Sequence, residues 1–279
     1  MTKHRIIIQL HDLDRTDPQQ LYGIHLAKAL EMPVTLLMVE RAHYAEMPTA
    51  IVGTGLELPP TISMEELKEQ AQQKLDSFSQ KAKNIWPYID HQVAIGFPEP
   101  TLLQLSEDEE NALLVIHAFN EPSTFNEWFG TYETRVAEGA NCPVLVVPKN
   151  MPWQQPVKLL YIMDMSDAKV ENMRILAKQA KALKADLQVI VIAEEEIAES
   201  DDTFQLTVNI FRNLLGYKEA TFHRIFGKKR SAQVQDLIEA LQPDWFAFEQ
   251  KNKNFLERII DDYNTKRLLL ESDIPVLVF

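Results

Sequence analysis

The sequence predicts an α/β protein made of two tandem domains, each with a five-stranded parallel sheet. Three observations support this fold class. Short apolar runs alternate with segments of helical period, which is typical of parallel sheets covered by helices. The apolar run at residues 143–147 has a counterpart at residues 275–279. The segment that begins at Arg5 also matches the one that begins at Lys158 without a gap, so one domain is repeated within the chain.

The first domain is expected at residues 1–150. Apolar runs predict its strands at residues 5–10, 34–39, 91–95, 112–117 and 144–147. Helical spacing predicts its helices at residues 18–32, 64–85, 100–105 and 131–139. The best defined of these helices begins after Ser63, which is suited to cap it, and Glu66 stands at the capping-box position.

The second domain is expected at residues 156–279, after a linker at residues 148–156 that contains three prolines. Its predicted strands are residues 158–162, 187–193, 220–226, 245–248 and 276–279. Its predicted helices are residues 169–184, 203–215 and 231–241, and one more that ends near residue 271. Phe204, Val208, Phe211 and Leu215 form one stripe of the helix at residues 203–215, and we expect this stripe to be its buried face.

The composition argues against several classes of protein. The net charge of −13 argues against a surface for nucleic acid or for anionic membranes, because phosphate groups need compensating Lys and Arg. No apolar run approaches the roughly 18 residues that a membrane-spanning helix requires. The N-terminus leads directly into the first strand without an apolar signal segment, and the single cysteine excludes an internal disulfide. We therefore expect a cytoplasmic protein.

Each half resembles a universal stress protein domain, and the chain resembles a tandem member of that family over nearly its whole length. The resemblance rests on residues 163–166 at the end of a first strand, on Gly96 and Gly227 after the third strands, and on the sequence Asn-Cys-Pro-Val-Leu-Val-Val at residues 141–147. It implies the adenine-nucleotide α-hydrolase-like fold. It also implies pseudo-twofold pairing of the two halves through their last strands, which makes the chain an internal pseudo-dimer.

The resemblance also indicates where ATP-binding members hold their ligand. Such members carry a glycine-rich loop after the fourth strand, and this loop ends in Gly-Ser or Gly-Thr. Glycines there let backbone N–H groups approach a phosphate closely. Gly130 and Thr131 match the end of that motif, whereas His117 and Asn120 stand at the two earlier glycine positions.

The second half departs further from the ATP-binding pattern. Asp262 and Tyr263 stand where the Gly-Thr pair is expected, and a carboxylate is electrostatically unfavourable beside a phosphate. Asp164 keeps the family's nucleotide-facing aspartate, and His11 takes its place in the first half. Because neither half carries the full set of residues, we expect neither to bind ATP tightly.

The fold class also indicates where other ligand residues should lie. In such sheets ligands bind beyond the C-terminal ends of the strands, where the strand order reverses. The turns after residues 10, 117, 162 and 248 are therefore the places to search. His11 and His117 lie at two of them and are our first candidates for a pocket without a glycine cradle. The seven histidines show no spacing typical of metal ligands, so we expect no metal site.

Three functional hypotheses follow. The leading one is a stress-response binding or scaffold protein, as the resemblance implies, which has no catalytic activity and no cofactor and acts on an unknown protein partner or by self-association. The second is an ATP- or AMP-binding switch, or a slow ATPase, that uses Gly130, Thr131 and Asp164. The third is a small-molecule sensor that uses His11 and His117. Whether two whole chains also form a homodimer is left open.

Overall fold

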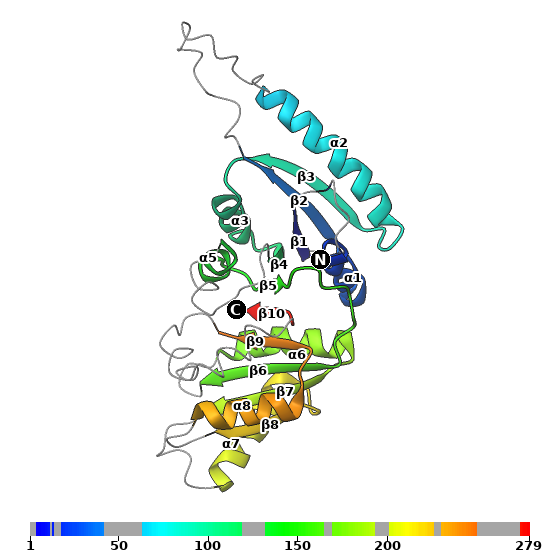
Figure 1. Cartoon of the computed structure of the whole chain (residues 1–279). Helices are drawn as coiled ribbons and strands as arrows, with labels where there is room; N and C mark the ends of the chain where they lie inside the picture. Colours follow the sequence, from blue (N-terminus) through cyan, green and yellow to red (C-terminus); the bar gives the residue numbers. More distant parts are fainter. Residues whose placement is uncertain are drawn as a thin grey trace, which may run out of the picture.

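The computed structural model describes residues 4–11, 13, 18–41, 63–118, 132–164, 169–192, 201–225, 230–249 and 274–279. These residues form one ten-stranded sheet with helices on both of its faces. The molecule is elongated, and the two halves of the chain lie end to end along the sheet (Figure 1). The predicted α/β fold is confirmed, whereas the domain boundaries at residues 150 and 156 stay a prediction.

The first half contributes five strands in the order β3-β2-β1-β4-β5. They are β1 Arg5–Leu10, β2 Val34–Glu40, β3 Ile89–Ile95, β4 Asn111–His117 and β5 Val144–Val147. Every pairing among them is parallel. Ile6 and Ile8 contact one layer of helices and Ile7 contacts the other, so β1 is apolar without alternation because both of its faces are buried.

The second half repeats this arrangement in the order β10-β9-β6-β7-β8. Its strands are β6 Lys158–Asp164, β7 Asp186–Ile192, β8 Thr221–Ile225, β9 Trp245–Phe248 and β10 Val276–Val278. The pairings within this half are also parallel. Each predicted strand is present, and its ends differ from the prediction by at most two residues.

The two halves are joined through β5 and β10, which pair in antiparallel orientation. Val276 is opposite Val146, Leu277 is opposite Leu145 and Val278 is opposite Val144. This contact confirms the predicted pairing through the last strands. Within each half, every strand runs parallel to the last strand. Because the two last strands, β5 and β10, are antiparallel, the strands of the two halves point in opposite directions. Their C-terminal ends therefore lie on opposite sides of the continuous sheet.

The described helices form two layers, one on each face of the sheet. One layer contains α1 Pro18–Leu30, α2 Met64–Lys83, α6 Val170–Leu183 and α7 Asp201–Leu215. The other contains α3 Pro98–Ser106, α5 Tyr132–Gly139 and α8 Arg230–Leu241. The helix predicted to end near residue 271 lies outside the described residues. None of the helices in the described parts of the chain has the length and apolar content needed to cross a membrane.

Two local features explain how α1 and α2 are positioned. A glycine at position 23 lets α1 approach the sheet, since a Cβ atom there would lie only 2.9 Å from Cδ1 of Ile8. At the start of α2, the Ser63 hydroxyl accepts a hydrogen bond from the Glu66 N–H at 3.1 Å. The Ser63 N–H donates in return to the Glu66 carboxylate at 3.0 Å, so the predicted capping box is confirmed.

Candidate functional site

The strand order reverses once in each half, and these two places are the candidate sites. In the first half the chain proceeds from β1 outward to β3 and then returns to β4 on the other side of β1. In the second half it proceeds from β6 outward to β8 and returns to β9 on the other side of β6. We call the C-terminal ends of β1 and β4 the first switch point, and those of β6 and β9 the second switch point.

His117 is the last residue of β4 and lies at the first switch point. Its side chain is buried, with 1% of its surface exposed. Its Nδ1 atom is 2.9 Å from the backbone carbonyl oxygen of Gln9, so Nδ1–H donates to that oxygen in the neutral ring. Burial lowers the pKa of His117 to about 4, and hydrogen bonding to the backbone of Gln9 and Gln19 opposes this only in part. The ring is therefore neutral near pH 7.

His11 follows β1 directly and is coupled electrostatically to His117. Burial lowers the pKa of His11 to about 3, and the neighbouring His117 and Arg41 lower it further. The backbone carbonyl of His11 accepts a hydrogen bond from the Gln20 side-chain amide at 2.7 Å, which ties this strand end to the first turn of α1. The structure thus brings together the two histidines that the sequence predicted, and both are uncharged at neutral pH.

Gln9 links the first switch point to α5. The Tyr132 hydroxyl donates to the Gln9 side-chain oxygen at 2.5 Å. Gln9 is fully buried, and its side-chain nitrogen has no hydrogen-bond partner among the described residues. The Nε2 atom of His117 likewise lacks a well-aligned partner within the described part of the chain. These two nitrogen atoms leave hydrogen-bonding capacity at the first switch point, which a bound molecule could use.

The second switch point is built differently, around a buried carboxylate. Glu249 follows β9 and is 9% exposed. Its Oε1 atom accepts a hydrogen bond from the Tyr161 hydroxyl at 2.8 Å and another from the Lys169 backbone N–H at 2.9 Å. Burial raises the pKa of Tyr161, and the Glu249 carboxylate raises it further, so the hydroxyl keeps its proton and donates.

Glu249 also serves the N-terminus of α6. Lys169 is the N-cap residue of that helix, and its own side chain makes no capping hydrogen bond. The first N–H groups of a helix lack partners within the helix and attract negative charge. The carboxylate at this position therefore supplies, from the protein itself, the anion that such a helix end favours.

Three residues predicted from the sequence cannot be placed as ligand contacts. Asp164 is the last residue of β6 and pairs with Ile192, at the position equivalent to His11, but its side chain is not among the described ones. Gly130 and Thr131 lie outside the described residues. Their proposed roles stay predictions. Within the described residues no group of three potential metal ligands is found.

The sequence did not single out Gln9, Tyr132, Tyr161 or Glu249. The two strand residues lie within apolar runs and resemble core positions. Glu249 does stand in one of the turns expected to face a ligand, directly after the strand at residues 245–248. A buried glutamate is uncommon unless it is paired, so its position at that turn was the available signal.

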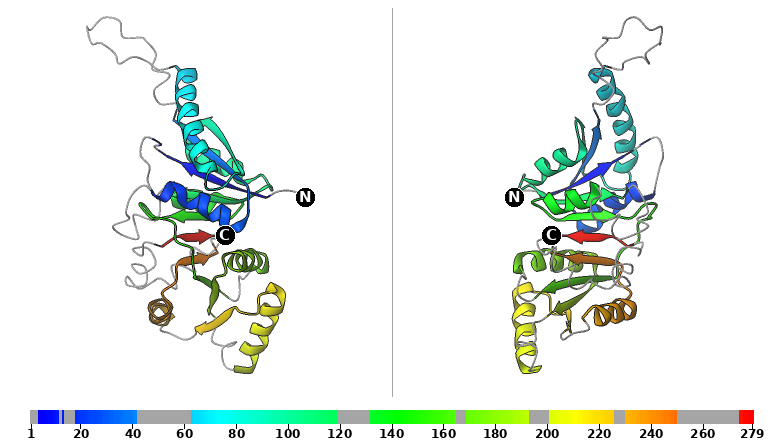
Figure 2. Two further views of the ribbon diagram at one scale, coloured as in Figure 1. Left: turned by 90° about the vertical axis from the view of Figure 1, so that its right-hand side faces the viewer. Right: turned by 60° about the vertical axis from the view of Figure 1, so that its left-hand side comes forward.

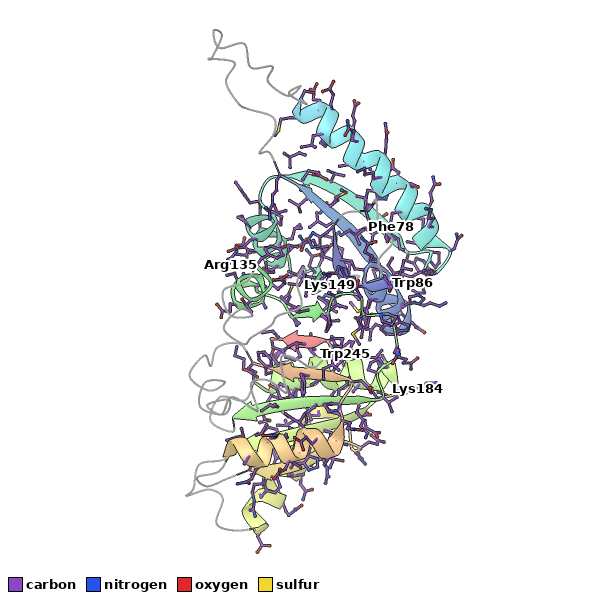
Figure 3. The ribbon with its side chains drawn as sticks, viewed as in Figure 1. Phe78, Trp86, Arg135, Lys149, Lys184 and Trp245 are labelled. Atoms are coloured by element: carbon purple, nitrogen blue, oxygen red, sulfur yellow. The ribbon has the colours of Figure 1, made fainter. Side chains whose placement is uncertain are left out.

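A cavity of about 550 Å³ lies beside the joint between the halves. Tyr22 and Trp245 contribute to its wall, as do Lys149 and Asp244. Figure 3 labels Lys149 and Trp245, which lie on the two sides of the joint. Much of the remaining lining is the linker, including Met151 and Gln155. None of the residues described above at the two switch points lines this cavity.

Comparison with solved structures shows how common this architecture is. A universal stress protein from Archaeoglobus fulgidus is 14% identical, with a TM-score of 0.67, and the match covers 100% of this chain and 98% of that one. A protein from Pseudomonas aeruginosa described as a universal stress protein is 15% identical, with a TM-score of 0.62 and coverage of 100% and 94%. A functionally unknown protein from Pseudomonas aeruginosa is 16% identical, with a TM-score of 0.56 and coverage of 100% and 93%.

No protein-family model matches the sequence, and no curated protein is significantly similar to it. The structural matches nevertheless extend over the whole chain, so both halves contribute to them. The chain therefore has the universal stress protein fold from end to end. At these sequence identities the likeness establishes the fold, and function has to be argued from the two switch points.

Proposed function

We propose that this chain acts as a tandem universal stress protein in a stress response, by binding or scaffolding a protein partner, without tight ATP binding and without catalysis. The observation that carries this proposal is the internal carboxylate of the second switch point. Glu249 accepts hydrogen bonds from the Tyr161 hydroxyl and from the backbone N–H of Lys169, the N-cap residue of α6. A nucleotide phosphate placed here would meet a buried negative charge instead of free backbone donors.

The two histidines at the first switch point do not supply the positive charge that a triphosphate needs. His11 and His117 are the titratable side chains that end β1 and β4, and the lowered pKa values keep both neutral at physiological pH. A neutral imidazole can donate or accept one hydrogen bond but does not compensate a triphosphate. This supports the same conclusion for the first half.

Two features of the first switch point favour a second candidate function, a small-molecule sensor in that half. Among the described residues, the buried side-chain nitrogen of Gln9 has no hydrogen-bond partner, and the buried Nε2 of His117 has no well-aligned one. Arg41, which follows β2, is close enough to lower the pKa of His11, and its charge suits a ligand with a single anionic group. The same features support the residual nucleotide switch or slow ATPase, which needs Gly130 and Thr131 as well.

Thermal unfolding with and without millimolar ATP and magnesium distinguishes these functions. A ligand at about 100 times its Kd would add about 2.7 kcal/mol to the free energy of unfolding. We expect no shift for the wild type, and none for Glu249→Gln, whose acceptor oxygen is kept while the charge is removed. ATP hydrolysis measured on the same samples should not exceed that of the buffer.

Two outcomes would overturn the leading proposal. An ATP-dependent shift that is lost in His117→Asn would show a working nucleotide site in the first half. A shift that appears only in Glu249→Gln would instead support the leading proposal, because the wild-type carboxylate would then be what keeps ATP out of the second switch point. If ATP has no effect but a small organic anion stabilises the wild type and not His117→Asn, the sensor function replaces the scaffold function.

A further inference from the structure

Helix α7 carries two apolar stripes, and the fold uses only one of them. Val208 is buried, and Phe204, Phe211 and Leu215 pack against the core beneath the helix. Phe211 stacks on Phe222 of β8, with 6.2 Å between the ring centroids. This inner stripe was predicted from the sequence and attaches α7 to the sheet.

The second stripe consists of Leu206, Ile210 and Leu214, and we call it the outer stripe of α7. These residues are spaced four apart, so they lie on one face of the helix. They are 62%, 50% and 39% exposed. The three large aliphatic side chains lie in one row on the solvent-facing side of the helix. They therefore form a continuous apolar patch, unlike isolated exposed apolar residues, which are common on protein surfaces.

Charged residues flank the outer stripe at its two ends: the exposed Asp202 stands one turn before Leu206, and Nε of the exposed Arg174 donates to the Leu214 carbonyl oxygen at 3.0 Å. The exposed residues between positions 205 and 214 are the three of the outer stripe together with Gln205, Asn209 and Asn213. Arg212 is the single charged residue in this interval, and it is directed elsewhere. Its guanidinium donates to the Ala220 carbonyl at 3.3 Å and lies over the ring of Phe222, 5.9 Å from the centroid.

The equivalent helix of the first half shows that the fold does not require an apolar outer face. Helix α2 occupies the same place in the order of elements, between the second and third strands of its half. Its buried residues are Ala71, Leu75, Ser79 and Ala82. Its exposed charged residues are Glu65, Glu66, Lys68, Glu69, Lys74, Lys81 and Lys83. The same position is thus solvated in one half and apolar in the other.

The position of α7 makes its outer stripe accessible. Helices α2 and α7 lie at opposite ends of the elongated molecule, as Figure 1 and Figure 2 show. The joint between β5 and β10 lies between them, so it does not cover α7. A partner can therefore reach the outer stripe without separating the two halves.

We propose that the outer stripe of α7 is the contact between two copies of this chain. Each copy carries a net charge of −13, so a stable contact requires a face that brings no like charges together. The outer stripe itself is uncharged, and it has Asp202 near one end and Arg174 near the other, so an antiparallel pairing with a second copy brings opposite charges together. In an antiparallel helix pair about a two-fold axis, Ile210 meets Ile210 of the second copy while Leu206 meets Leu214.

The size of the patch sets the strength of the contact. Stable interfaces bury about 800 Å² on each partner, which is more than one helix face of this length supplies. The dimer is therefore weak and dependent on concentration. This inference is independent of whether either switch point binds a nucleotide.

Sedimentation velocity from about 1 µM to about 1 mM tests the contact. We expect the wild type to approach twice the mass of one chain as its concentration rises. Ile210→Lys and Ile210→Glu should each stay monomeric, because the two-fold axis places like charges opposite each other. An equimolar mixture of the two variants should regain the dimer. Gln73→Lys on the exposed face of α2 is the matched control and should associate like the wild type.

Three results would overturn the proposal. They are a wild type that stays monomeric throughout, position-210 variants that associate as the wild type does, and a mixture of the two variants that shows no association. Far-UV circular dichroism and thermal unfolding of each variant establish that it is folded. If a variant at position 210 does not fold, Leu206→Asn and Leu214→Asn provide the same test with smaller changes, and each should weaken the association at least tenfold.

Discussion

Trp245 of β9 donates its indole N–H to the hydroxyl oxygen of Tyr22 in α1, with 2.7 Å between the two atoms. Both side chains are buried, at 1% and 0% exposure. The two residues belong to different halves of the chain, so this hydrogen bond joins the halves at a second place besides the β5–β10 pair. An edge-to-face contact between Tyr22 and Trp153 of the linker, with centroids 5.0 Å apart, extends the same cluster.

Replacing Tyr22 with Phe leaves the Trp245 N–H buried without an acceptor. We expect the free energy of unfolding to fall by about 1–3 kcal/mol, as measured by chemical denaturation. Tyr88→Phe is the control, because Tyr88 is 61% exposed and its hydroxyl is free to bond with water. A loss in Tyr22→Phe no larger than in Tyr88→Phe would mean that the hydrogen bond does not stabilise the joint.

Replacing Glu249 with Ala leaves both the Tyr161 hydroxyl and the Lys169 N–H without their acceptor. The expected loss is again about 1–3 kcal/mol of unfolding free energy. Glu249→Gln should lose less, because the amide oxygen still accepts both hydrogen bonds. Glu239→Ala on the exposed face of α8 makes the same change in net charge and should have almost no effect. Equal losses for the Ala and Gln variants would contradict the role of the oxygen as an acceptor.

The buried histidine at the end of β4 predicts a pH dependence of stability. His117 has a folded-state pKa of about 4 against an ordinary value of 6.5, so the unfolded chain binds the proton more readily between these two values. The free energy of unfolding should therefore fall as the pH is lowered from 6.5 to about 4. Below pH 4, His117 should cause no further loss of stability. The slope from one such group reaches about 1.4 kcal/mol per pH unit.

His11 contributes to the pH dependence in the same direction, since its pKa is lowered to about 3. His117→Asn should reduce the slope between pH 6.5 and 4 without abolishing it. Val147→Ala is a suitable control, because Val147 pairs with His117 in the neighbouring strand. That variant should be less stable at every pH and keep the wild-type slope. An unchanged slope in His117→Asn would show that the histidine is not buried in the neutral form.

The capping box of α2 predicts that replacing Ser63 lowers the stability of the protein. Ser63→Ala removes the acceptor for the Glu66 N–H and should lower the free energy of unfolding by about 1 kcal/mol. Ser77→Ala makes the same chemical change at an exposed position in the middle of α2. Because alanine favours the helix interior, Ser77→Ala should be neutral or slightly stabilising. The expected result, measured by thermal unfolding, is a loss of stability in Ser63→Ala and no loss in Ser77→Ala.

The strands and the joint could be predicted from the sequence because they depend on local patterns and on the repeat. A run such as Ile6-Ile7-Ile8 is diagnostic of a strand buried on both faces. The turns of the second switch point were predicted, but the hydrogen bond between Tyr161 and Glu249 was not, because the two residues are 88 positions apart and meet only through the strand order. The roles of Gln9 and Tyr132, which are 123 residues apart, depend on the same long-range placement.

Helix α7 illustrates a different limit of sequence analysis. Phe204 and Val208 were assigned to the buried face because they share one stripe, and that assignment is confirmed. Leu206, Ile210 and Leu214 have the same spacing and form a second stripe. Periodicity identifies a helix with two apolar stripes but does not say that one of them is left facing solvent. Only the position of α7 at the end of the sheet shows this.

The antiparallel β5–β10 pair also has a consequence for how the two halves can differ. A dimer of identical subunits has the same residue on both sides of its axis, so any substitution changes both partners at once. Here the two partners are segments of one chain, and each position occurs in one half alone. The joint also forms at any dilution, because its effective concentration is set by the linker and not by the amount of protein. One half can therefore present a charged helix and the other an apolar one while their mutual contact is preserved.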